Sequence, residues 1–218
     1  MLVPGRPAPP LSRLLPLLHP HAGAERGETL VLTTGSVSGA EIAAVLGEGR
    51  RRGNIRVLVI GSLGVHPDAA SPRLRDLWAL EEACRASGLP VMALRLSPLL
   101  GAASPLWRRL RSRPALGRHA SVLLCPMAET DAALALHRAV ELEWTGTEWY
   151  DVAGPEMWSL AELAELARGV GERLRAGAGD WEPALEEMAE ARLPELSAWR
   201  QRSALVPSGI GALAASWS

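Results

Sequence analysis

The 218-residue sequence predicts an α/β fold with a doubly wound parallel sheet and a small helical part at its C-terminal end. Short apolar runs recur along the chain, amphipathic helical patterns fill the gaps between them, and the connections are short. Alternation of this kind builds right-handed βαβ units around a parallel sheet. With 48% hydrophobic and 22% charged residues, the chain also has the composition of a packed domain.

The predicted strands are nearly continuously apolar, which is typical of strands buried on both faces of a parallel sheet. Four runs show this pattern: Thr29–Thr34, Ile55–Ile60, Val91–Leu96 and Ser121–Cys125. A fifth run, Glu148–Ala153, alternates more clearly between polar and apolar residues, so we expect it at the edge of the sheet.

Helical patterns separate these runs. Capping boxes of the form Ser-x-x-Glu begin at Ser38 and at Ser159, and each precedes an apolar helix face. Two further helical patterns centre on Leu74–Cys84, which Gly88 ends, and on Ala133–Val140. Leu185, Met188 and Ala189 suggest one more helix, and we expect the Gly/Ala/Ser-rich end from Ser208 to fray.

Composition excludes several classes of function. The formal net charge of −1 argues against general nucleic-acid binding. All 23 basic residues are Arg, so no lysine is present for a Schiff base or a P-loop. The two cysteines and five histidines show no metal-binding spacing. No apolar run reaches the length of a membrane span, and we expect a cytoplasmic protein without a membrane partner.

The most specific pattern begins with the stretch Ile55–Gly101. It is made of Glu82, Ser87-Gly88-Leu89-Pro90, Leu94-Arg95 and Gly101, followed later by Pro126–Ala133 (PMAETDAA) and Trp149–Leu163 (WYDVAGPEMWSLAEL). In order and spacing, over about residues 29–170, this pattern resembles the atypical, extended-like short-chain dehydrogenase/reductases, the NAD(P)-binding group of NmrA-like and epimerase-like proteins. The resemblance implies a Rossmann-like sheet, shortened here, with NAD or NADP as cofactor.

The resemblance also implies three regions. Residues 1–28 take the place of the nucleotide-binding loop and are degenerate or replaced. Residues 29–145 form the Rossmann-like core, and residues 146–218 form a small region that is helical and resembles a substrate lobe.

The catalytic positions of that family carry different residues here. The family's Ser falls on Ser62, but its Tyr falls on Arg73 and its Lys falls on Leu77. A guanidinium stays protonated near neutral pH and Leu77 has no polar group, so the family's proton relay is absent. The only tyrosine, Tyr150, lies far along the chain in the fifth predicted strand.

The cofactor-binding positions are only partly kept. Glycines at the family's opening let the backbone approach a pyrophosphate, and here Gly5 alone survives among four prolines. The positions that the resemblance assigns to the cofactor are Gly5, Thr33, Thr34, Gly35, Gly61 and Ser62. The stretch Thr33–Gly35 is equally well explained as a turn into the next helix, and Ser62 as a residue that caps a turn.

Three residues are candidate substrate contacts: His66, Arg95 and Asp131. His66 follows a predicted strand, but the His-Pro-Asp sequence is also explained by turn chemistry. Arg95 and Asp131 either hold a substrate or pair with each other, and pairing is the commoner use of such residues. Trp107, with the arginines that follow it, is either a basic–aromatic surface or part of an amphipathic helix.

Two hypotheses about function follow. In the first, the chain is an NAD(P)-binding oxidoreductase or epimerase with impaired or altered chemistry, in which Ser62 or a water replaces the tyrosine. In the second, it is a non-catalytic sensor, assembly or scaffold protein that keeps the fold. The corresponding partner is a small-molecule ligand or another protein.

Overall fold

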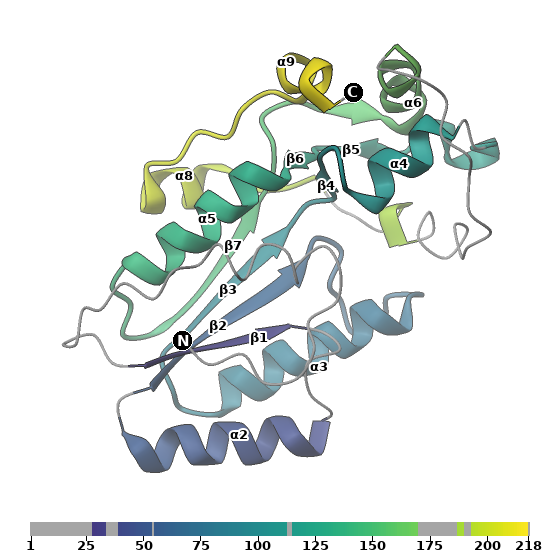
Figure 1. Cartoon of the computed structure of the whole chain (residues 1–218). Helices are drawn as coiled ribbons and strands as arrows, with labels where there is room; N and C mark the ends of the chain where they lie inside the picture. Colours follow the sequence, from purple (N-terminus) through teal and green to yellow (C-terminus); the bar gives the residue numbers. More distant parts are fainter. Residues whose placement is uncertain are drawn as a thin grey trace.

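A four-stranded parallel sheet forms the centre of the computed structural model, which describes residues 28–33, 39–53, 55–112, 115–169, 187–189 and 193–217. The strand order is β1 (Glu28–Thr33), β2 (Ile55–Ser62), β3 (Val91–Leu96) and β7 (Thr147–Val152). Figure 1 shows the sheet between two helical layers. The predicted parallel sheet is confirmed, and the fifth predicted strand is the edge strand β7.

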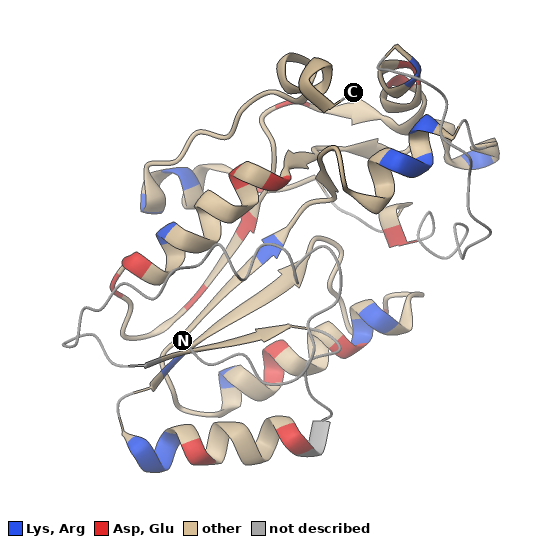
Figure 2. Cartoon of the chain, in the orientation of Figure 1, with Lys and Arg blue, Asp and Glu red and all other residues tan. Residues whose placement is uncertain are grey.

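Helices cover both faces of this sheet. Helices α2 (Gly39–Arg52) and α3 (Pro72–Ala86) lie on one face, and α5 (Glu129–Glu141) and α8 (Ser197–Ser203) lie on the other (Figure 1). Strand β2 explains the need for two layers, because Val57 and Val59 pack toward α2 and α3 while Leu58 and Ile60 pack toward α5. Charged residues lie mostly on the helices (Figure 2), as burial of the central strands requires.

A small lobe follows the end of β3 and has its own hydrophobic core. It contains two short sheets, β4 (Leu99–Leu100) with β6 (Met127–Ala128) and β5 (Leu123–Leu124) with β8 (Trp158–Ser159). Its helical elements are α4 (Pro105–Arg111), η2 (Gly117–Ser121), α6 (Leu160–Arg168), α9 (Ile210–Leu213) and η3 (Ala214–Trp217). The predicted capping box of Ser159 and Glu162 is present at α6. The predicted box at Ser38 lies outside the described residues.

Two expectations about this lobe are wrong. The run Ser121–Cys125 adds no strand to the main sheet, because only Leu123 and Leu124 are extended and they pair antiparallel with β8. The chain end from Ser208 is packed rather than frayed, since Ile210 and Ala214 are fully buried in the small-lobe core.

Trp107 belongs to the same core rather than to a surface. It is fully buried, and its ring meets that of Trp217 edge to face, with 5.1 Å between the centroids. Trp217 therefore holds the chain end on the lobe. The aromatic part of the possible basic–aromatic surface is consequently not available to a ligand. Within the described residues, no helix has both the length and the hydropathy that crossing a bilayer requires.

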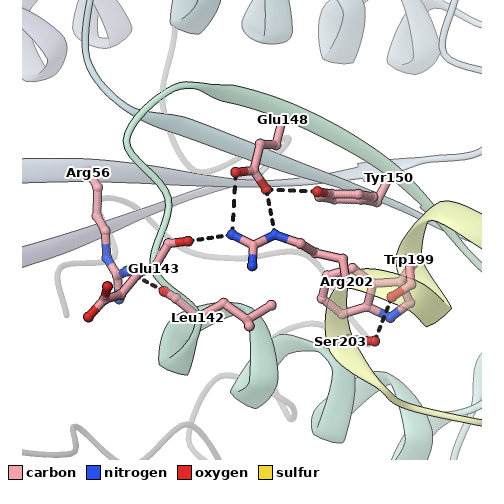
Figure 3. Close-up of polar contacts among 8 residues, drawn as sticks. All are labelled: Arg56, Leu142, Glu143, Glu148, Tyr150, Trp199, Arg202 and Ser203. Carbon is pink, nitrogen blue, oxygen red and sulfur yellow. Dashed lines mark hydrogen bonds and ion pairs between the residues drawn. The ribbon is translucent and has the colours of Figure 1, made fainter.

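Arg56 connects the amino edge of the sheet to the end of α5. Its side chain is 8% exposed, and its Nε donates to Thr29 Oγ1 at 2.9 Å. One terminal nitrogen donates to the carbonyl of Leu142 (Figure 3) and the other to that of Val140. The guanidinium also stacks over the Trp144 ring. Carbonyls at a helix end have no partner within the helix and favour a nearby cation, so Arg56 stabilises both β2 and α5.

A second contact holds α8 on the edge strand. Arg202 Nε donates to Glu148 Oε2 at 3.0 Å, and the Tyr150 hydroxyl donates to the same oxygen at 2.8 Å (Figure 3). The rings of Tyr150 and Trp199 lie 5.4 Å apart. Helix α8 thus covers the face of β7 that carries Tyr150.

The substitution Arg56→Met is expected to lower the free energy of unfolding by about 2–3 kcal/mol, because it leaves Thr29 and two partly buried carbonyls without their charged donor. Urea denaturation measures the change. The control Arg51→Met removes an arginine whose side chain is 77% exposed, and it should cost no more than about 0.5 kcal/mol. Equal losses from the two variants would contradict the structural role of Arg56.

Candidate functional site

The carboxyl edge of the main sheet is the candidate site. Ligands of doubly wound folds bind where the carboxyl ends of parallel strands meet. Strands β1 and β2 reach this edge at Thr33 and Ser62, and β3 reaches it at Leu96. Helix α3 begins here at Pro72, and the small lobe follows β3, so the edge lies between α3 and the small lobe (Figure 1).

Only part of the predicted cofactor set lies within the described residues. Thr33 is 2% exposed at the end of β1, and Ser62 is half-buried at the end of β2. The Ser62 carbonyl accepts from Val65 N at 3.4 Å, which closes the turn after the strand. Gly5, Thr34 and Gly35 lie outside the described residues.

Gly61 makes room for a protein side chain. A Cβ at this position would lie 3.0 Å from Glu81 Oε1. Gly61 therefore lets the Glu81 carboxylate lie close against the sheet. The resemblance assigns Gly61 to the cofactor, whereas in this structure it lies against Glu81 of α3.

Buried Glu81 forms an ion pair with partly buried Arg95 beneath the carboxyl edge. Arg95 Nε lies 3.2 Å from both Glu81 oxygens, and Arg95 Nη2 donates to Oε2 at 2.5 Å. The Glu81 side chain is 0% exposed, and Trp149 Nε1 also donates to it at 3.0 Å. Burial lowers the pKa of Arg95, but the hydrogen bond and charge of Glu81 outweigh it and leave that pKa raised.

The predicted pairing of Arg95 with Asp131 does not occur. Arg95 lies on the α3 side of the sheet with Glu81, whereas Asp131, in the first turn of α5, accepts from Ser208 N at 2.7 Å. Asp131 therefore holds the C-terminal segment. The two residues lie on opposite faces of the sheet and do not form one substrate site.

His66 lies in the loop between β2 and α3. Its Nδ1 accepts from Asp68 N at 3.2 Å, and its ring is tilted against Trp78 with 6.3 Å between the centroids. The imidazole side chain is 41% exposed. This hydrogen bond agrees with turn chemistry for His66.

The two positions of the family's Tyr and Lys are committed to contacts within the protein. Arg73 Nε lies 2.9 Å from Glu187 Oε1, and Arg73 Nη2 lies 2.7 Å from Oε2. The hydroxyl of Ser71 donates to the same carboxylate at 2.6 Å. Leu77 is 1% exposed and packs in a cluster with Val65, Ala69 and Leu74.

Glu187 is held as a carboxylate by these contacts. Burial alone raises the pKa of Glu187, but the hydrogen bonds from Arg73 and Ser71 outweigh burial, so that pKa lies below its ordinary value. Of the predicted helix around Leu185 and Met188, residues 187–189 are described and are helical. Leu185 lies outside the described residues.

Tyr150 does not replace the missing tyrosine. It pairs with Leu94 in the register of β3 and β7, and its side chain lies on the face covered by α5 and α8. Burial, followed by the hydrogen bond to Glu148, raises the pKa of the Tyr150 phenol. A catalytic tyrosine needs a lowered pKa to exchange protons near neutrality. Tyr150 therefore acts in packing.

Three residues at this edge were not found from the sequence. Glu81 is the buried carboxylate, whereas Glu82, to which the resemblance assigned the family's glutamate, pairs with Arg85 at the surface. Glu187 lies more than a hundred residues from its partner Arg73. Ser97, directly after β3, is 3% exposed, and its hydroxyl has no hydrogen-bond partner among the described residues.

Among the described positions, those that the resemblance assigns to the cofactor or to proton transfer make contacts within the protein, whereas Gly5, Thr34 and Gly35 lie outside the described residues. The space next to Gly61 is filled by Glu81, and Thr33 is almost completely buried. The positions where the resemblance places a proton donor and a ribose contact are Arg73, bound to Glu187, and buried Leu77. Nor does the described part of the chain contain a group of three His, Cys, Asp or Glu side chains that would hold a metal ion.

Comparisons by sequence give no match: no protein-family model fits the chain, and no curated protein is significantly similar to it. Solved structures do match in fold. A nucleoside-diphosphate-sugar epimerase from Staphylococcus aureus superposes with a TM-score of 0.65 at 14% identity, covering 86% of this chain and 76% of that one. The dTDP-glucose 4,6-dehydratase from Bacillus anthracis in complex with NAD superposes with a TM-score of 0.64 at 13% identity, covering 87% of this chain and 72% of that one.

A third solved structure, MoeE5 in complex with UDP-glucuronic acid and NAD, has a TM-score of 0.60 at 16% identity, covering 82% of this chain and 69% of that one. Identities this low show the fold alone. The predicted Rossmann-like α/β class is thereby confirmed, and the chain shares its fold with epimerases and dehydratases, several of which were solved with NAD.

The substitution Arg95→Met is expected to lower the free energy of unfolding by about 3–5 kcal/mol, because it leaves the Glu81 carboxylate buried without its cation. The double variant Glu81→Met/Arg95→Met should regain most of this loss, since no buried charge is then left unpaired. Urea denaturation of the three proteins tests the pair. Additive losses would show that the two residues act independently.

Glu187 should make the stability of the protein depend on pH. A carboxyl group with a lowered pKa stabilises the fold above its ordinary pKa of 4.5, and it loses that contribution as the pH falls through the native value. The difference in unfolding free energy between the wild type and Glu187→Gln should therefore be largest near neutral pH and shrink below 4.5. A difference that is constant from pH 7 to pH 3 would contradict this assignment.

Proposed function

We propose that the chain is a catalytically impaired protein on an NAD(P)-binding fold, whose remaining role is binding rather than hydride transfer. The main support for the proposal comes from the side chains at the family's two catalytic positions. Where the resemblance places an acid/base tyrosine and its lysine, Arg73 is bound to Glu187 and Leu77 is buried. The proposal thus rests on what these side chains do in the fold as well as on their identity.

The chemistry of the two residues supports impairment. Proton transfer requires a group whose pKa lies near the working pH, and a guanidinium does not meet this condition. Leu77 neither lowers a neighbour's pKa nor donates a hydrogen bond.

Two glycine positions, Gly61 and Gly5, argue for weak cofactor binding. Structural neighbours were solved with NAD, and some of these complexes also hold UDP-glucuronic acid or UDP-glucose. In this chain, Glu81 occupies the space at Gly61, and the sequence offers only Gly5 where the family has a glycine-rich opening. Fewer backbone donors for a pyrophosphate mean a smaller share of binding energy from that group.

A second candidate is a sensor, assembly or scaffold role with a protein partner. A shallow pocket between α5 and the C-terminal segment favours it, because two of its apolar lining residues are well exposed: Leu134 at 53% and Val206 at 78%. Exposed apolar side chains around a hollow are typical of interaction surfaces. This role is compatible with the loss of catalysis.

Titration with NADH and NADPH separates impaired from active protein, because the eight tryptophans report ligand binding by fluorescence. We expect no saturable change up to about 1 mM dinucleotide, the upper end of typical enzyme KM values. With NAD and UDP-glucose or UDP-glucuronic acid, we also expect neither NADH formation nor a changed sugar product by chromatography.

Saturable micromolar binding together with turnover would overturn the proposal. In that case the variants Ser62→Ala and His66→Ala identify the replacement acid/base group. The control Arg51→Met, far from the carboxyl edge on α2, should leave any such activity unchanged.

A further inference from the structure

The stretch 187–189 bridges the two parts of the molecule. Glu187 contacts Ser71 and Arg73 at the start of α3, while the next residue, Met188, packs against the small-lobe core that includes Leu106 and Trp107. Figure 1 shows this short stretch between the beginning of α3 and helix α4. The bridge lies beside the carboxyl edge, where ligands of this fold class bind.

The two side chains that hold Glu187, Arg73 and Ser71, point hydrogen-bond donors at one anionic group. Arg73 presents Nε and Nη2 side by side to both carboxylate oxygens, which is the forked geometry that guanidinium groups offer to carboxylates and phosphates. Ser71 is the N-cap residue of α3, yet its side chain makes no capping bond to the helix and donates to Glu187 instead. An N-cap serine usually accepts a helix N–H, so this hydroxyl is diverted to the anion.

A neighbouring arginine fixes the backbone that carries these donors. Arg75 donates through Nη1 to the carbonyls of Ala69 and Ala70, the two residues that precede Ser71. The loop before α3 is therefore held in place by contacts independent of Glu187.

We propose that Ser71 and Arg73 form a binding site for an oxyanion, a phosphate or carboxylate group of a small molecule, and that Glu187 occupies this site as an internal competitor. An incoming oxyanion replaces the Glu187 carboxylate on the same three donors: the Ser71 hydroxyl and Arg73 Nε and Nη2. Displacement also frees Met188 from its place between the lobes. Binding of the anion is thus coupled to the contact of Met188 with the small-lobe core.

The exposure of the pair fits such an exchange. The Glu187 side chain is 22% exposed and that of Arg73 is 45% exposed, so solvent and a solute reach the pair. Ion pairs with this exposure are modest in strength, and a ligand with more oxygens or more charge competes with them. The inference does not depend on whether nicotinamide dinucleotides bind.

The first test removes the competitor. Glu187→Gln keeps the shape of the side chain but removes its charge, and inorganic phosphate should bind this variant about tenfold more tightly than the wild type in calorimetry at constant ionic strength. Acetate in place of phosphate shows whether a carboxylate also binds. Adding Arg73→Met to Glu187→Gln should abolish the gain.

The matched control is Glu165→Gln, which removes a carboxylate from an exposed ion pair with Arg168 on α6. This variant should bind phosphate as the wild type does. Equal phosphate affinity in Glu187→Gln and the wild type, or an equal gain in Glu165→Gln, would overturn the proposal.

A second measurement uses the wild-type protein and does not depend on the stability of a variant. Hydrogen exchange is followed in the peptide containing residues 187–189, in phosphate and in chloride at matched ionic strength. Displacement predicts faster exchange of this peptide in phosphate, with unchanged exchange in α2. Identical exchange in the two salts would show that phosphate does not compete with Glu187.

Discussion

Burial of the parallel sheet on both faces constrains the rest of the structure. A charged side chain that enters the sheet layers needs a partner inside the protein, because little or no water reaches it there. Arg56 meets this condition at the amino edge through the end of α5, and Arg95 meets it near the carboxyl edge through Glu81. These two arginines tie the sheet to a helix on each face, and Gly61 is the glycine that makes space for the second pair.

The same constraint explains how the carboxyl edge differs from a dinucleotide site. Positions that would face a ligand are used for internal contacts: Gly61 accommodates Glu81, Arg73 holds Glu187, and Leu77 completes an apolar cluster. A fold shared with epimerases and dehydratases does not determine chemistry, which depends on the side chains at the site. Here these side chains bind one another in ion pairs and apolar contacts.

Much of the fold was predictable, because long apolar runs and helix signals are local. The strands around Val59, Ala93 and Tyr150 and the capping box at Ser159 were all predicted from short windows. The run Ser121–Cys125 misled because apolar content alone does not distinguish a sheet strand from a short segment of another core. The packed chain end was missed since small residues such as Ala214 carry no periodic signal, although they fit tightly against a neighbouring core. The partners of Arg73 and Arg95 depend on tertiary placement, and neither Glu187 nor Glu81 has a sequence motif that indicates it.

The central claim is that Arg73 is engaged by Glu187, and a double-mutant cycle on this pair tests it most directly. The cycle compares the unfolding free energies of the wild type, Arg73→Met, Glu187→Gln and the double variant at neutral pH. The account predicts a coupling free energy of about 1 kcal/mol, a value suited to a forked but partly exposed ion pair. Additivity within about 0.3 kcal/mol would mean that the two residues do not interact in solution, and it would contradict the claim.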